Sequence, residues 1–320
     1  MSYTQGDLIE AADYNNIIGT SPGSTTNRLN TVWAVGSGSA GYGQTPVSSV
    51  SASALVTAAQ WATLINTLNS TLTHQAGSGS GISAPVAGNQ INYLSTLQTQ
   101  VNNSYTNRLT FASNSAVTAG SALAYAAWTV TATNGVNTGT LTRAFGARAS
   151  FASADQARYF FNSGGRLKFN VTGTSAAGAR SVAALALLNN LGGIAIFSAN
   201  TNGGRTGTGG TLGTNDTAKG YYTSTFNANT TVVAVTSTTA SYTGDTGTIT
   251  VKPSGTQGSN NDNGIQIDFW CTINSTSGAN AGSLYFDDSL TLTPTVSIDI
   301  SYPEVTNLTN SWGTVTITQL

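Results

Sequence analysis

The sequence predicts an α+β protein that is mainly β: an N-terminal helical region followed by an antiparallel β-sandwich or jelly-roll-like domain with short helical inserts. Apolar residues recur at helical spacing in the first third of the chain, and alternate with polar residues after it. The alternating segments are short and are separated by Gly, Asn and Ser turns, which is typical of antiparallel sheets. We therefore place a helical attachment or oligomerisation region at residues 1–109 and a β-rich domain at residues 110–320.

Three helices are predicted in the first region, at residues 7–18, 53–74 and 90–107. The first stops at Gly19, because glycine is common just past a helix end. Residues 20–49 predict a loop with one short apolar run at 32–35. The third helix carries apolar residues at seven-residue spacing around Gln98, which fits either a short coiled-coil seam or a two-helix hairpin. We favour the hairpin because fewer than three heptads are present.

Alternation of apolar residues with Thr predicts strands at residues 129–133, 230–236, 248–252, 265–270, 290–293, 296–302 and 315–318. The β-branched Thr side chain suits the solvated face of such a strand. A helical insert is predicted at 153–161, with Ser153 and Asp155 as candidate caps. A second insert at 179–191 is apolar nearly all round, so we expect it to be buried between a sheet and another surface, such as a neighbouring subunit.

The composition excludes several classes of protein. The chain has 52 Thr, 36 Ser, 30 Asn and 36 Gly among 320 residues, with 11 basic and 12 acidic side chains. Nucleic-acid binding is not expected, because it needs clustered basic residues. No membrane span and no secretory signal are expected, since long apolar stretches and a basic N-terminal segment are missing. The single Cys271 leaves no intrachain disulfide and no Cys-rich zinc site.

Residues that could carry chemistry are few. The sole histidine, His74, lies at a predicted helix end, where we expect it to interact with the helix dipole rather than act as a base or ligand. Asp268 is expected on the wet face of a strand, and Asp287 and Asp288 in a turn. Asp262 lies in an Asn-Asp-Asn-Gly segment that predicts a turn rather than a calcium site. We therefore expect no catalytic residue, no metal and no cofactor.

Two other patterns have simple interpretations. Residues 36–41 match the dinucleotide-binding fingerprint formally, but no helix pattern and no acidic residue follow at the required spacing, so the match is attributed to chance. Aromatic residues could stack on sugar rings, although core packing or subunit contact is favoured for each of them. The candidates are Trp270, Trp312, Tyr221, Tyr222 and Tyr242.

Two stretches carry a resemblance to known proteins. Residues 5–17 contain Gly-Asp-Leu-Ile followed by Asp-Tyr-Asn, and resemble the "G-D-x-I-x-A-x-D-Y-N" start of many structural proteins of tailed bacteriophages, including tail and neck appendages. The resemblance implies an attachment role for this stretch. The residues concerned are Asp7, Ile9, Asp13, Tyr14 and Asn15.

The second stretch, residues 157–169, is similar to an "A-R-x-F-F-N-S-G-G-x-I" motif of virion proteins, notably from phages of marine and cyanobacterial hosts. Its local pattern predicts a helix end, a turn in which Gly164 or Gly165 has a positive φ, and a strand that starts at Arg166. We interpret it as a structural motif. Its members are Arg158, Phe160, Phe161, Asn162, Gly164 and Gly165.

The resemblance implies a virion component, homo-oligomeric as a trimer or higher and bound to other virion proteins. The leading hypothesis is a non-enzymatic structural subunit, an appendage, fibre or collar- or tail-associated protein. The alternative is a receptor-binding tip that recognises a host surface glycan; a capsid decoration protein and a glycan-degrading enzyme are less favoured. Low charge gives weak protection against association, which suits a subunit held in an assembly.

Overall fold

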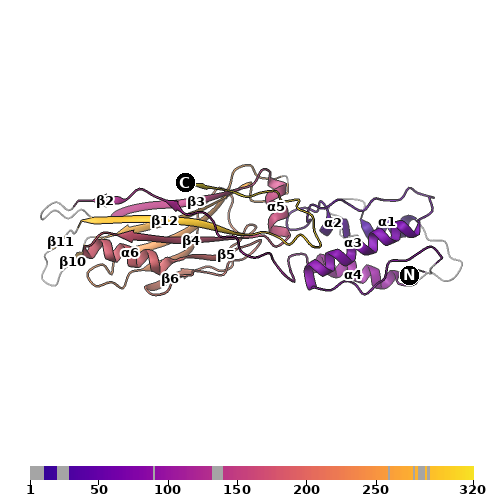
Figure 1. Cartoon of the computed structure of the whole chain (residues 1–320), viewed down its shortest axis with the longest axis horizontal. Coiled ribbons are helices and arrows are strands. Elements are labelled where there is room, and N and C mark those ends of the chain that lie inside the picture. The colour runs from indigo at the N-terminus through magenta and orange to yellow at the C-terminus, as the bar shows by residue number, and fades with distance from the viewer. Residues whose placement is uncertain are drawn as a thin grey trace.

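The computed structural model shows two parts that lie end to end (Figure 1). It describes residues 11–19, 29–88, 91–131, 140–258, 260–276, 278–279, 285–286 and 289–320. One part holds the helices α1 (Ala11–Ile18), α2 (Leu29–Trp33), α3 (Ala58–Ala76) and α4 (Leu94–Thr106). The other holds two antiparallel sheets together with α5 (Ala154–Asn162) and α6 (Ala179–Leu191). The predicted fold class, mainly β with an N-terminal helical region, is confirmed.

Local capping sets the ends of the longest helix, α3. The Thr57 hydroxyl accepts from the Gln60 N–H, and the Gln60 side chain accepts from the Thr57 N–H, so that α3 starts at Ala58. Gly77, with φ of 78°, ends it. The predicted start at residue 53 was wrong, and Leu55 is 80% exposed outside the helix.

The other N-terminal helices also differ from their predicted bounds. The helix predicted at 90–107 begins at Leu94, and the apolar run predicted as part of a loop forms the short helix α2. Helices α3 and α4 pack against each other within the chain, as the hairpin interpretation predicted. Their shared core includes Trp61, Leu64, Leu68, Leu97 and Val101, all fully buried.

Asparagine side chains hold the extended segments of this part in place. The Asn15 amide donates to the Val50 carbonyl at 2.7 Å and accepts from the Val50 N–H at 2.8 Å. Asn30 makes the same pair of bonds with Val47, at 2.9 and 2.8 Å. A side-chain amide has both a donor and an acceptor, so each Asn replaces the backbone partner that a neighbouring strand would supply.

The β part consists of a five-stranded and a six-stranded sheet, with one short extra ladder. The first sheet has β12 (Leu290–Ser301) beside β4 (Arg166–Ser175), then β5 (Gly193–Phe197), with β1 (Leu123–Ala124) and β2 (Trp128–Val130) on its other side. The second has the order β13 (Thr316–Gln319), β3 (Leu141–Ser150), β9 (Gln266–Ser275), β8 (Thr246–Ser254), β7 (Thr230–Thr236) and β6 (Thr211–Asn215). The extra ladder pairs β10 (Gly278–Ala279) with β11 (Tyr285–Phe286).

The inner faces of the two sheets meet in one apolar core. Phe169 of β4 stacks on Phe269 of β9 with ring centroids 5.3 Å apart. Helix α6 packs on strands of both sheets: a Cβ on Gly173 would meet Leu188 at 2.8 Å, and one on Gly247 would meet Leu191 at 2.7 Å. These glycines allow α6 its close approach, so its expected burial is met within the chain, without a neighbouring subunit.

Two strands differ from the prediction. Strand β3 was not predicted, because its Leu-Thr-Arg-Ala-Phe-Gly-Ala-Arg-Ala-Ser sequence is rich in Ala and Arg, which have little strand preference. The segments predicted at 290–293 and 296–302 form the single strand β12, which continues through Pro294. Among the described residues, no helix is both long and apolar enough to cross a lipid bilayer.

Candidate functional site

The motif that carries the second resemblance forms helix α5 and the start of β4. The Ser153 hydroxyl caps α5 by accepting from the Gln156 N–H at 3.1 Å. Gly164 has φ of 92°, as predicted for one of the two motif glycines, while a Cβ on Gly165 would lie 2.6 Å from the Phe160 ring. The helix end, the turn and the strand start that the sequence predicted at Arg166 are all confirmed.

Two polar residues of this motif, Arg158 and Asn162, hold the loop at residues 36–41; we call the pair the clamp. Arg158 is 2% exposed and donates from Nη1 to the carbonyl oxygens of Gly36 and, at 2.7 Å, Ala40. Asn162 donates to the carbonyls of Gly38 and Gly41 at 3.0 and 3.2 Å. The loop belongs to the N-terminal part and the clamp to the β part, so these bonds join the two.

Charge and backbone geometry both favour this arrangement. Asp155 accepts from Arg158 Nη2 at 3.1 Å, and the buried Asp262 lies 3.8 Å from Arg158 Nε, so the guanidinium has two carboxylates nearby. Gly41 has φ of 95°, a conformation that side chains rarely adopt. Gly43 has φ of 71°, and a Cβ there would meet the Tyr159 ring. The glycines that produced the dinucleotide-fingerprint match therefore shape the loop that the clamp binds.

A buried histidine–carboxylate pair lies at the same junction. His74 is 1% exposed, and its Nδ1 is 2.8 Å from Oε1 of Glu304, which lies in the loop after β12. Its ring lies 5.1 Å from that of Tyr42 and 5.4 Å from that of Phe111. The expected interaction with the helix dipole is therefore not its main contact, and Glu304 is a partner that the sequence reasoning missed.

The environment shifts both pKa values of the pair. Burial lowers the pKa of His74 from its ordinary 6.5, against the effect of Glu304. Burial by itself raises the pKa of Glu304, but hydrogen bonds from Asn307, His74 and Thr306 outweigh it and hold that pKa below its ordinary 4.5. A neutral histidine beside a carboxylate is the favoured state near neutral pH. In the part of the chain that the structure describes, no group of three or more His, Cys, Asp or Glu could hold a metal ion.

The carboxylates considered for catalysis occupy different places. Asp268 is 1% exposed, so its expected position on a wet strand face was wrong: Arg148 covers it with two hydrogen bonds, at 2.6 and 2.9 Å, and Lys252 Nζ lies 3.8 Å away. Asp262 faces the clamp. Asp287 and Asp288 lie outside the described residues. The structure brings neither Asp262 nor Asp268 into a pocket.

The residues with a predicted attachment role are mostly engaged within the chain. Tyr14 packs edge-on against Trp61 with ring centroids 5.4 Å apart, and Asn15 binds the Val50 backbone. Asp13 lines a hollow of about 380 Å³ between α1 and α4, which Leu94 also lines. Asp7 and Ile9 lie outside the described residues.

Most of the aromatic candidates for sugar stacking are buried. Trp312, Tyr221 and Tyr242 are at most 3% exposed, as the packing interpretation predicted. Tyr222 is half-buried and donates to the Gly38 carbonyl at 2.9 Å, which adds a further bond to the loop that the clamp holds. Trp270 is half-buried, with its ring against Gly146.

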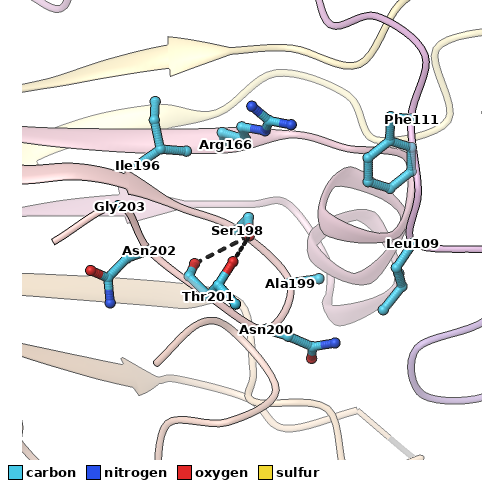
Figure 2. Close-up of a pocket in the computed structure, with 10 residues that line it drawn as sticks. All are labelled: Leu109, Phe111, Arg166, Ile196, Ser198, Ala199, Asn200, Thr201, Asn202 and Gly203. Carbon is cyan, nitrogen blue, oxygen red and sulfur yellow. Dashed lines mark hydrogen bonds between the residues drawn. The ribbon is translucent and has the colours of Figure 1, made fainter. Parts of the chain in front are cut away.

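A pocket of about 590 Å³ opens beside the junction, and we call it the waist pocket (Figure 2). The segment that follows α4 supplies Leu109 and Phe111 to one side, and the turn at residues 198–203 supplies the other. Arg166, at the start of β4, is the one charged residue that lines it among the described residues. Sequence reasoning missed this pocket, because its sides come from three distant segments.

Comparisons with known proteins add no family to this picture. No protein-family model matches the chain, and neither a curated protein nor a solved structure matches it.

Proposed function

We propose that this chain is a non-enzymatic structural subunit of a tailed-phage virion: an appendage, fibre or collar- or tail-associated protein that works as a homo-oligomer of three or more copies. In this proposal the helical end attaches to other virion proteins and the β end projects away from them. Both ends are then parts of one extended subunit, held at a fixed angle by the junction between them.

The observation that carries the proposal is what the phage-like motif does in the fold. Its polar residues, Arg158 and Asn162, are buried and bind backbone carbonyls of the loop at 36–41. A motif used in this way fixes the position of one part relative to the other and leaves no reactive side chain exposed. The end-to-end arrangement in Figure 1 gives such a joint a mechanical purpose, because a load on one end is transmitted through it.

The neutral surface supports the same proposal. The chain carries only 11 basic and 12 acidic side chains in 320 residues, and net charge is a main defence of a free monomer against association. Several of these few charges are also paired, as Arg148 is with Asp268 and Lys219 with Asp216. A subunit surrounded by copies of itself and by other virion proteins has no need of that defence.

Sedimentation of the purified 320-residue chain tests the proposal. We expect a discrete species of three or more copies at micromolar concentration, measured by sedimentation velocity and by native mass spectrometry. Antibodies against the chain should also label intact phage particles by immunogold electron microscopy at a single structural position. A chain that remains monomeric at all concentrations, and that labels no particle of the phage encoding it, contradicts the proposal.

A further inference from the structure

We propose that the waist pocket is a binding site for a carboxylated saccharide. Its volume of about 590 Å³ falls within the range of small-molecule sites, about 300–1,000 Å³. Its lining combines a cation, an aromatic ring, aliphatic side chains, and amide and hydroxyl groups. Each of these groups matches one part of an acidic sugar.

Arg166 is the group that would bind the carboxylate. The Asn114 amide, oriented so that both of its hydrogen bonds are made, accepts from Arg166 Nη2 at 2.8 Å and donates to the Gly164 carbonyl at 3.0 Å. This contact fixes the guanidinium on the pocket side while using only part of its donor set. Within the described residues no carboxylate lies in ion-pair contact with Arg166. A guanidinium in this position is free to form a paired hydrogen bond with a carboxylate.

The remaining lining matches the other parts of a sugar. Phe111 and Leu109 offer an apolar surface against which the C–H face of a pyranose ring can pack (Figure 2). Across from them, Asn200 is exposed and Thr201 exchanges a long hydrogen bond of 3.3 Å with Ser198. Amides and hydroxyls of this kind can donate to and accept from sugar hydroxyls.

A bound sugar would contact both parts of the molecule. Leu109 and Phe111 lie on the segment that leaves the helical part, and Phe111 also packs against His74. The turn at 198–203 and Arg166 belong to the β part. Occupancy of the waist pocket should therefore also stabilise the junction. The inference does not depend on the virion role, because it concerns one chain; a negative binding result leaves the sedimentation test unaffected.

Calorimetric titration of the full chain with matched sugar pairs tests the inference. The probes are galacturonate trisaccharide against galactose trisaccharide, and sialyllactose against lactose. We expect at least one acidic member to bind about tenfold or more tightly than its neutral counterpart, since hydrogen bonds to charged groups are the stronger ones. Arg166→Gln should remove that preference, whereas Lys168→Gln, two residues along the same strand and outside the pocket, should keep it.

Further measurements separate binding from folding. Circular dichroism spectra and melting curves of Arg166→Gln should match those of the wild type, so that any loss of affinity is a loss of the site. Asn200→Ala should weaken both members of a pair equally. Lack of saturable binding by both acidic sugars at millimolar concentration overturns the inference. Unchanged binding by Arg166→Gln, or displacement of the sugar by acetate at equal concentration, overturns it as well.

Discussion

The helical part and the β part satisfy their backbone polar groups in different ways. In the β part, strands pair with strands over long ladders, such as the ten residue pairs between β3 and β9. In the helical part, the extended segments have no such ladder, and the amides of Asn15 and Asn30 bind the backbone of Val50 and Val47 instead. Because buried backbone groups need partners, the same requirement selects Thr on strand faces and Asn beside loops.

The difference predicts that the two parts depend on single residues to different degrees. A ladder distributes its free energy over many backbone bonds, whereas an Asn-held segment depends on one side chain. The clamp is the extreme case, because two side chains connect one part to the other. Substitutions in the clamp, in the helical part and in the β core should therefore have effects of decreasing size.

The largest effect is expected for Arg158→Met. It removes a buried cation, leaves the carbonyl of Ala40 without that donor and leaves the buried Asp262 without its nearby charge. Breaking a buried charged network in this way costs about 3–5 kcal/mol of the free energy of unfolding. Urea unfolding followed by circular dichroism measures this loss, and calorimetry should show the two parts melting at separate temperatures.

Lys219→Met is the matched control for Arg158→Met. Lys219 also loses a charge, but it is partly exposed and lies 3.9 Å from Asp216 in a surface pair. Such pairs contribute about 0–1 kcal/mol. Equal losses for the two variants would mean that the clamp does not couple the parts.

A smaller and local effect is expected for Asn15→Ala. It leaves the Val50 N–H and carbonyl without their partner, which costs about 1–3 kcal/mol. Hydrogen exchange should show faster exchange in residues 47–50 and in α1, with strands β3 and β9 unchanged. Asn16→Ala, one residue further along α1 and exposed, should change stability by less than about 0.5 kcal/mol. An equal loss for Asn16→Ala would contradict the assignment of the amide.

Lowering the pH should weaken the junction through the His74–Glu304 pair. Burial lowers the pKa of His74 below 6.5, so between that value and the folded-state value the unfolded chain binds a proton that the folded chain does not. The free energy of unfolding therefore falls as the pH falls through this window. The pKa of Glu304 is also lowered, so its contribution is lost at still lower pH.

Urea melts at pH about 7.5 and 5.5 measure this effect. His74→Gln should flatten the difference between the two pH values. His74 is the only histidine of the chain. Burial raises the pKa of Asp245, which acts in the opposite direction, but that residue is present in both proteins and cancels in the comparison. A steeper pH dependence in the variant would show that the sign is wrong.

The smallest effect is expected at Cys271, which reports on the β core. The thiol is fully buried, and burial raises its pKa far above the ordinary value, so it should react with a thiol reagent only when the β part opens. Its reaction rate should be the same in Asn15→Ala as in the wild type. A faster reaction in that variant would mean that the two parts open together.

Local patterns predicted a large share of the elements. The cap at Ser153, the left-handed Gly164 and the strand start at Arg166 follow from residues close together in the sequence, and all three were correct. The missed strand β3 has few residues with strand preference, and its place between β13 and β9 decides its conformation. The start of α3 was missed because the capping box at Thr57 was not weighed against the apolar pattern before it.

The sequence by itself determined the change from helices to strands, the short motif at α5 and the glycines of the loop at 36–41. Each is written in neighbouring residues, through propensity, periodicity or backbone freedom. Tertiary structure alone decided that Arg158 and Asn162 bind that loop, that His74 meets Glu304, and that Arg166 and Phe111 share a pocket. These pairs are far apart along the chain, and burial selects such partners by their position in space, which no local pattern records.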